Sequence, residues 1–162
     1  MSTSQPSPQS AVARRSAEAE LRGLIARFAP AHQGLIGTMR RSLRKRLRTA
    51  HEVVYEYSDC VVISYSPNER GYEGVLALRA SAKGVELYFN RGTGLPDPDK
   101  LLRGSGKLAR FIHIEGASAL RHPAVARLID EAIARSRVPF ATTGRGPVVI
   151  RSTSARKRRR PA

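Results

Sequence analysis

The sequence predicts a single α+β domain in which an antiparallel sheet of about five strands carries helices on one face. Three observations lead to this expectation. Two stretches with apolar residues at helical spacing come first, short segments of β-type composition follow, and a third helical stretch comes after them. With 162 residues, of which 41% are hydrophobic, the chain has the size and composition of one domain with a core.

The helices are predicted from apolar spacing and from capping residues. The first 13 residues are rich in Ser, Gln and Pro, which favours a disordered N-terminal tail. Ser16 then suits the N-cap of a first helix, with Glu18 in its first turn, where the helix dipole favours negative charge. A second helix is expected over roughly residues 32–48, and Pro123 is expected in the first turn of a third.

Between the second and third helices, the apolar pattern changes to short segments rich in Val, Ile and Tyr. Turn-forming residues separate them, which is typical of consecutive antiparallel strands. Four strands are expected in residues 52–57, 60–66, 74–81 and 84–90, and a fifth in residues 108–114. Residues 138–152 have the composition for one further short strand. The domain is therefore expected to span residues 14–150, followed by a disordered basic tail at residues 151–162.

Charge is the unusual property of the composition. The chain has 29 Lys and Arg against 13 Asp and Glu, a net charge of +16. Residues 1–50 hold ten basic and two acidic residues, and residues 151–162 hold six basic residues and no acidic one. The basic excess therefore lies at the two ends of the chain. Such ends attract polyanions, chiefly nucleic acid or an anionic membrane surface, although they also keep a protein soluble.

The sequence shows no sign of export or of a membrane span. Cys60 is the only cysteine, so the chain forms no internal disulfide. No segment approaches the run of about 20 apolar residues that a spanning helix needs. The first residues lack the apolar centre of a secretory signal. We therefore expect a soluble, cytoplasmic protein.

Two basic segments are the predicted polyanion-binding regions. In the second helix, Arg40, Arg44 and Arg48 recur four residues apart, and like charges at this spacing repel by a few tenths of a kcal/mol. Either a polyanion relieves this repulsion or the residues form a solvated helix face. The candidate residues are Arg40, Arg41, Arg44, Lys45 and Arg48 in the helix, and Arg156, Lys157, Arg158, Arg159 and Arg160 in the tail. Because Trp is absent and other aromatic residues are few, contacts with phosphates are expected rather than stacking on bases.

The other candidate site is a glycine-rich loop at residues 91–107, RGTGLPDPDKLLRGSGK. It fails the Walker-type phosphate pattern because Leu108 follows Gly106 and Lys107. We expect a mainly structural loop in which Asp97 caps a single helical turn and Gly104 ends it. The alternative is a nest for a phosphate or carboxylate, made by Arg91, Gly92, Asp97, Arg103, Gly106, Lys107 and Arg110.

The same region resembles the motif of a widespread bacterial family, the YdhG-like proteins, also described as domain of unknown function 1801. The family's fold is similar to that of frataxin, a layer of helices against an antiparallel sheet, so the resemblance implies the same α+β architecture. It covers roughly residues 17–135, and the matching positions are Phe89, Gly92, Leu95, Asp97, Pro98, Leu101, Leu102, Gly104, Gly106, Lys107, Arg110 and Phe111.

The resemblance leaves the activity open. One branch of the family is described as a frataxin-like intracellular iron chaperone, and most members have no assigned activity. Iron binding requires clustered carboxylates, and the candidates here are Glu52, Glu56 and Asp59. The four histidines show no metal-ligand spacing, and no pairing of a nucleophile with a base is recognisable. We therefore expect a non-catalytic binding or accessory protein that associates with nucleic acid, with iron binding as the alternative and no other cofactor.

Overall fold

The computed structural model describes residues 8–152 of the chain. Its α-helices are α1 (Pro8–Ile25), α2 (Pro30–Arg46) and α3 (Pro123–Ala134). Its strands are β1 (His51–Glu56), β2 (Cys60–Ser66), β3 (Leu76–Ser81), β4 (Gly84–Phe89), β5 (Arg110–Ile114) and β6 (Val148–Ser152). Three short 3-10 helices lie between them: η1 (Gly71–Glu73), η2 (Gly92–Gly94) and η3 (Ala117–Arg121). The predicted α+β class is confirmed.

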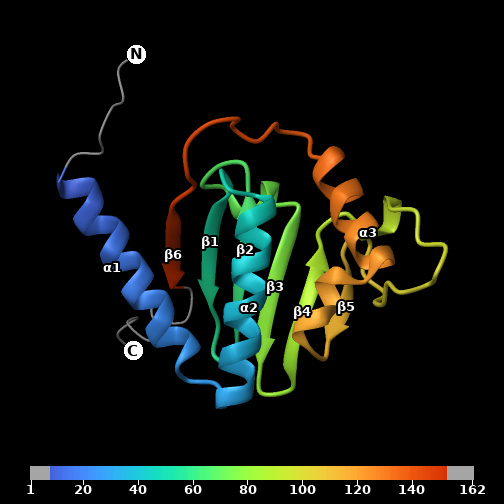
Figure 1. Ribbon diagram of the computed structural model, residues 1–162, viewed down its shortest axis with the longest axis horizontal. Coiled ribbons are helices and arrows are strands. Elements are labelled where there is room, and N and C mark those ends of the chain that lie inside the picture. The colour runs from blue at the N-terminus through green and yellow to red at the C-terminus, as the bar shows by residue number, and fades with distance from the viewer. Residues whose placement is uncertain (1–7, 153–162) are drawn as a thin grey trace, which may run out of the picture.

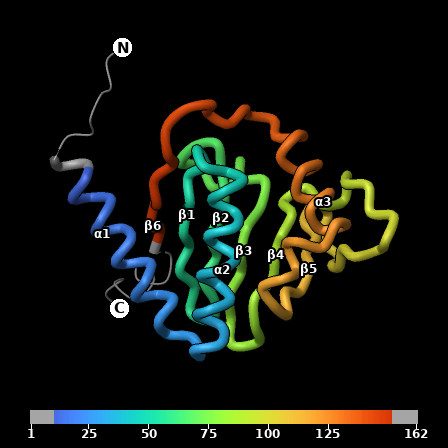
Figure 2. The backbone as a smooth tube through the Cα atoms, in the orientation of Figure 1, coloured from blue at the N-terminus to red at the C-terminus, as the bar shows by residue number. Residues whose placement is uncertain are grey.

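The sheet has six strands in the order β5-β4-β3-β2-β1-β6 within the described residues. Strands β1 to β5 form the predicted antiparallel meander, whereas β6 pairs with β1 in parallel. The prediction of a purely antiparallel sheet of about five strands is therefore wrong. After α3 the chain crosses from the β5 side of the sheet to its opposite edge (Figures 1 and 2). There it forms β6, which runs beside β1 and in the same direction as β1. The Thr49 hydroxyl holds this crossing segment by donating to the Ala141 carbonyl at 2.7 Å.

The helices cover one face and one edge of this sheet. Helices α2 and α3 lie across the same face, and α1 lies along the β6 edge (Figure 1). Buried residues from all three helices join one core with the strands, among them Leu21, Met39 and Ile129. Burial alternates along β4 as in a strand with one face on the core: Val85, Leu87 and Phe89 are buried, and the side chains between them are only partly covered.

The start of α1 differs from the sequence prediction, whereas the start of α3 matches it. Helix α1 begins at Pro8, so Ser16 lies inside the helix and caps nothing. Good helix formers such as Ala, Arg and Glu fill residues 11–20 and carry the helix through this position. In α3, Pro123 occupies the first turn as predicted, and His122 Nδ1 accepts the Ala124 N–H at 3.2 Å. None of the helices in the described range is both long and apolar enough to cross a membrane.

Candidate functional site

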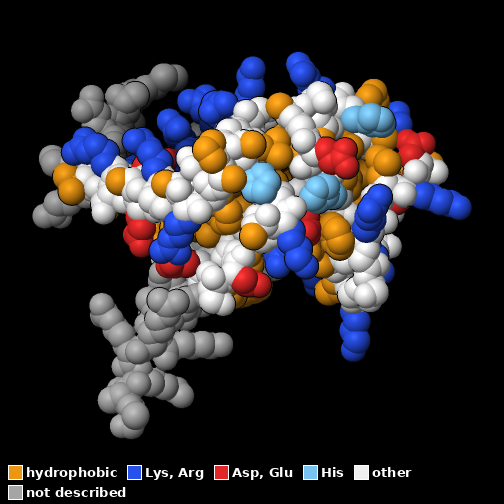
Figure 3. Space-filling view, turned by 90° about the horizontal axis from the view of Figure 1, so that it is seen from below, with side chains coloured by type: hydrophobic (Ala, Val, Ile, Leu, Met, Phe, Trp, Pro, Cys, Tyr) orange, Lys and Arg blue, Asp and Glu red, His pale blue; other side chains and the backbone are white. Residues whose placement is uncertain are grey.

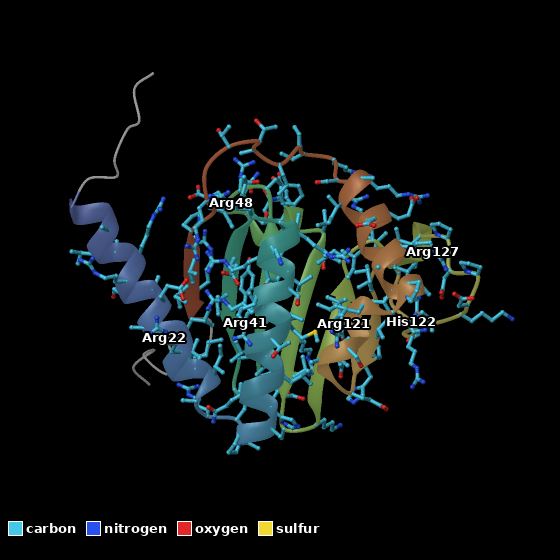
Figure 4. The ribbon with its side chains drawn as sticks, viewed as in Figure 1. Arg22, Arg41, Arg48, Arg121, His122 and Arg127 are labelled. Atoms are coloured by element: carbon cyan, nitrogen blue, oxygen red, sulfur yellow. The ribbon has the colours of Figure 1, made fainter. Side chains whose placement is uncertain are left out.

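A groove runs between α1 and α2 and reaches the start of β6. Its volume is about 1210 Å³. In Figure 4, Arg22 lies on α1, Arg41 lies on the side of α2 toward α1, and Arg48 follows the C-terminal end of α2. In the space-filling view of Figure 3, Lys and Arg side chains gather along the upper edge of the molecule. Among the described residues that line this space, Glu18 is the one acidic residue, and nine are basic: Arg14, Arg15, Arg22, Arg40, Arg41, Arg44, Lys45, Arg48 and Arg145. We call this space the basic groove.

Helical periodicity on α2 produces one wall of the basic groove. Ile36, Met39 and Leu43 are buried against the sheet. Because residues three and four apart share a helix face, this fixes the rotation of α2 about its axis. Arg41 and Lys45 consequently lie on the exposed side of the helix. Helix α2 therefore has a buried apolar face and an exposed basic face.

The other wall comes from α1 and from the segment that leads into β6. On α1, Arg15, Glu18 and Arg22 are three and four residues apart and therefore neighbours on the helix surface. Arg145 reaches the groove because the following residue, Gly146, donates its N–H to the Arg48 carbonyl at 3.0 Å. A side chain at Gly146 would place its Cβ 1.8 Å from the backbone carbonyl oxygen of residue 50, so only glycine fits here.

Two arginines of the groove belong to an ion-pair network that is buried beneath it. Glu52, on β1, is 1% exposed. Its carboxylate accepts hydrogen bonds from Arg40 Nε at 2.8 Å and from the Tyr65 hydroxyl at 3.1 Å, and it lies 3.0 Å from Arg44. Glu18 adds a second carboxylate, at 2.9 Å from Arg40 and 3.0 Å from Arg44. The network joins α1, α2, β1 and β2.

This network changes the interpretation of the basic helix. The predicted repulsion between Arg40 and Arg44 is relieved by carboxylates of the protein itself, a third possibility beside a polyanion and a solvated face. All 13 acidic residues of the chain lie in the described part, yet seven basic residues of the groove have no ion pair with any of them. These seven are Arg14, Arg15, Arg22, Arg41, Lys45, Arg48 and Arg145.

The network also fixes the charge states of its members. Burial alone would raise the pKa of Glu18, but hydrogen bonds and charge from Arg40 and then Arg44 hold it below its ordinary value of 4.5. Burial, and after it the neighbouring Glu52 carboxylate, raises the pKa of Tyr65 well above its ordinary value. Near neutral pH, Glu18 is therefore ionised and Tyr65 is a neutral hydrogen-bond donor.

The glycine-rich loop has a different backbone from the predicted one. The Asp97 carboxylate accepts the N–H groups of Leu101 and Leu102, both at 2.9 Å, but it does not cap a helical turn as predicted. The helical turn expected after Asp97 is absent: the Lys100 N–H closes a tight turn on the Asp97 carbonyl at 3.2 Å, and residues 101 and 102 have no regular secondary structure. Because the carboxylate takes N–H groups that a helical turn would direct to carbonyls, the helix does not propagate. Gly104 has the predicted left-handed backbone, with φ at +116°.

The basic side chains of this loop do not converge on one point. Arg110 donates to the Gly106 carbonyl and so directs its guanidinium onto its own loop. Arg103 and Lys107 are exposed and line neither the basic groove nor a second, smaller pocket. Of the predicted nest residues, only Arg91 lines this smaller pocket.

The smaller pocket has a volume of about 430 Å³ and lies between η1, the end of β4 and the C-terminal end of α3. Besides Arg91, it is lined by Arg135 and Arg137, which no sequence pattern indicated. Arg135 is held in place because it donates to the Gly94 carbonyl and pairs with Glu131 at 3.2 Å. We call this space the α3 pocket.

The residues considered for iron binding do not form a cluster. Within residues 8–152, no group of three or more His, Cys, Asp or Glu side chains is arranged to hold a metal ion. Glu52 is buried in the network, Glu56 pairs with Arg27 at 2.8 Å, and Asp59 is exposed. Cys60 is buried, and burial raises the pKa of its thiol, so it is not activated as a nucleophile.

Comparison with protein-family models, with curated proteins and with solved structures finds no match for this chain. The resemblance to the YdhG-like family stays a prediction that rests on the loop motif.

The sequence prediction found only part of the basic groove. It identified four basic residues of α2 and Arg48, which follows the helix, but missed Arg14, Arg15, Arg22 and Arg145. The spacing of Arg15 and Arg22 on α1 was a usable signal, since both lie on the helix face of Glu18. No sequence pattern indicated Arg145, because its position in the groove depends on the path of the chain from α3 across to β6. The predicted tail residues, Arg156, Lys157, Arg158, Arg159 and Arg160, lie outside the described range.

Proposed function

We propose that this protein binds double-stranded nucleic acid through its phosphate backbone, without sequence preference, in the basic groove. One observation carries the proposal. Seven basic residues line a single groove without a carboxylate partner, while the two most buried arginines beside them are neutralised internally. Unpaired cations held close together create the positive potential that attracts a polyanion.

The side chains of the groove suit phosphates better than bases. All of its basic residues except Lys45 are arginines, whose planar guanidinium makes paired hydrogen bonds to phosphate oxygens. No Phe, Tyr or His is found among its described lining residues, so it offers no platform for stacking unpaired bases. Phosphate contacts position a protein on nucleic acid but carry no sequence information. The groove therefore supports sequence-independent binding to a duplex.

The C-terminal basic tail is a second contributor in this proposal. Its five candidate residues follow β6, whose first residue, Val148, lines the groove. A variant that ends at Ser152 keeps β6 intact and removes only the tail, so it separates the contribution of the tail from that of the groove. We also propose that the protein is cytoplasmic and belongs with the YdhG-like family; the loop motif and the α+β architecture support the family assignment.

The test is a salt titration of duplex binding followed by fluorescence anisotropy. The quadruple variant Arg22→Ala, Arg41→Ala, Lys45→Ala and Arg48→Ala removes four unpaired cations of the groove. The slope of log affinity against log salt concentration should fall by about 3 to 4, since each phosphate contact contributes about 0.9. The same protein should bind the separated single strand no more tightly than the duplex.

The matched control removes the same charge elsewhere. Lys83, Arg103, Lys107 and Arg121 are exposed and lie outside the groove, so their replacement by Ala lowers the net charge equally. This control should keep most of the duplex affinity and the salt slope. An equal loss in both quadruple variants would mean that net charge, not the groove, binds the polyanion. Absence of duplex binding by the unchanged protein at low salt would overturn the proposal.

A further inference from the structure

We propose that the α3 pocket is a second binding site, which takes a small organic anion with a flat apolar body and a carboxylate. The site is independent of the basic groove, because no residue lines both spaces. Its lining residues come from the end of β4, from η1 and from the C-terminal end of α3, whereas those of the basic groove come from α1, from α2 and from the segment that leads into β6. A volume of about 430 Å³ is within the range of small-molecule sites.

The first argument is the apolar surface of the α3 pocket. Its lining includes apolar side chains from three stretches of the chain, residues 72–75, 89–95 and 132–138: Val75, Phe89, Leu95, Ala132 and Val138. Four large hydrophobic residues are strongly exposed in the described range, and two of them, Tyr72 at 78% and Leu108 at 53%, also line this pocket. Exposed apolar residues that gather at a concave site are typical of a surface covered by a ligand.

The second argument is the charge inside the pocket. Arg91 and Arg137 line it and have neither a hydrogen bond nor an ion pair through their side chains to any described residue. Arg135 is tied to the Gly94 carbonyl and to Glu131. The one carboxylate of the pocket, Glu73, is already engaged by Arg70 at 3.7 Å and by the Asn68 amide. Two guanidinium groups are therefore available for an anion.

These two arguments together define the class of ligand. An inorganic anion would satisfy the arginines but leave the apolar wall and Tyr72 exposed. A neutral apolar molecule would cover the wall but leave the guanidinium groups unpaired. A carboxylate on an aromatic or similarly flat body satisfies both, because a guanidinium binds a carboxylate with two parallel hydrogen bonds. The aromatic side chain of Tyr72 suits a flat partner.

The experiment uses the full chain and 2-naphthylacetate as the probe, with binding measured by isothermal titration calorimetry. The probe should bind saturably with one site per chain. Its neutral amide, 2-naphthylacetamide, should bind about tenfold more weakly or worse, since one tenfold step corresponds to the loss of one charge-assisted contact. Acetate should give no measurable binding, and inorganic phosphate should not compete with the probe.

Four variants locate the site. The double variant Arg91→Ala and Arg137→Ala should weaken probe binding about tenfold or more, and Leu108→Ala should weaken it less. The charge-matched control Arg103→Ala and Lys107→Ala, in the same loop but outside the pocket, should leave it unchanged. The quadruple groove variant should also leave it unchanged.

Three outcomes would overturn the proposal: no saturable binding of the probe, equal binding of the acid and its amide, or an equal loss in the control double variant. All replaced side chains are exposed or solvent-facing, and thermal unfolding of each variant confirms that the fold is intact. Duplex binding by the pocket variants should match that of the unchanged protein, so failure of this site is distinguishable from failure of the groove.

Discussion

Basic residues line a site at each end of the sheet, but the other side chains of the two sites differ in character. At the β6 edge, nine basic residues line an open groove in which Glu18 is the one acidic residue among those described. At the β4 side, three arginines line a smaller pocket with an apolar wall. In the basic groove the charge itself is the main feature of the surface. In the α3 pocket the charge is combined with exposed apolar area.

The difference shows that a count of arginines does not measure capacity to bind anions. Arg40 and Arg44 are in the most basic segment of the described chain, yet two carboxylates of the protein occupy them. Arg137 is in an unremarkable loop, yet it has no partner in the described residues. Whether an arginine is available for a ligand depends on which acidic side chains the fold brings to it.

The largest effect is expected at the centre of the network. Replacement of Glu52 by Ala should lower the free energy of unfolding by about 3 to 5 kcal/mol, because it leaves two largely buried arginines without their principal carboxylate. Urea denaturation measures this change. The α3 pocket should still bind its probe in the folded fraction, since the network does not reach it.

An exposed ion pair provides the control for Glu52. Asp130 is 73% exposed and pairs with Arg46 at 3.1 Å. Its replacement by Ala should cost less than about 1 kcal/mol, because solvent screens an exposed pair. If Glu52→Ala costs no more than Asp130→Ala, the network does not stabilise the groove end of the fold.

A smaller effect is expected at two glycines, one near each site. A Cβ at residue 146 would lie 1.8 Å from a carbonyl oxygen, and a Cβ at residue 92 would lie 2.5 Å from the Arg110 Cβ. Gly146→Ala and Gly92→Ala should each lower the free energy of unfolding by about 1 to 3 kcal/mol, the usual cost of overpacking. Gly146→Ala should also weaken duplex binding, and Gly92→Ala should weaken probe binding, because each shifts one wall of its own site.

A third glycine provides the control for this pair. Gly116 has an extended backbone and open space where a Cβ would lie, so Gly116→Ala should leave both binding reactions and the stability nearly unchanged. The two ends of the sheet would be coupled, rather than independent, if Gly146→Ala weakened binding of the probe as much as binding of the duplex.

The smallest effect is expected from the carboxylate that lines the groove. Glu18→Gln should strengthen duplex binding at low salt, because it leaves Arg40 and Arg44 less fully neutralised. The salt slope should steepen by about 0.9 if one additional phosphate contact forms. Fluorescence anisotropy against salt concentration measures both quantities.

The matched variant Glu20→Gln changes the net charge by the same amount. Glu20 is exposed on the same helix and is not among the residues that line the groove. It should leave the duplex affinity close to that of the unchanged protein. Equal gains from the two variants would mean that long-range charge, and not the local ion pairs, controls binding.

The sequence alone determined the local elements of this protein. Apolar spacing predicted α2 and α3 near their observed positions, and β-type segments predicted all five strands of the meander. These predictions succeeded because they depend on neighbours within a few residues along the chain. For the same reason, the basic face of α2 was predictable.

Only the tertiary structure decided which of these residues act together. The parallel strand β6 depends on a crossing from one edge of the sheet to the other, and this crossing brings Arg145 to α1 and α2. Glu52 meets Arg40 twelve residues before it, and Arg135 meets Gly94 across 41 residues. Ion pairs and apolar contacts form only between side chains that are close in space. For residues far apart in the sequence, that closeness is determined by how the segments pack in the fold. For this reason the sequence predicted a basic helix, whereas the fold divided its cations into those paired within the protein and those exposed in the basic groove.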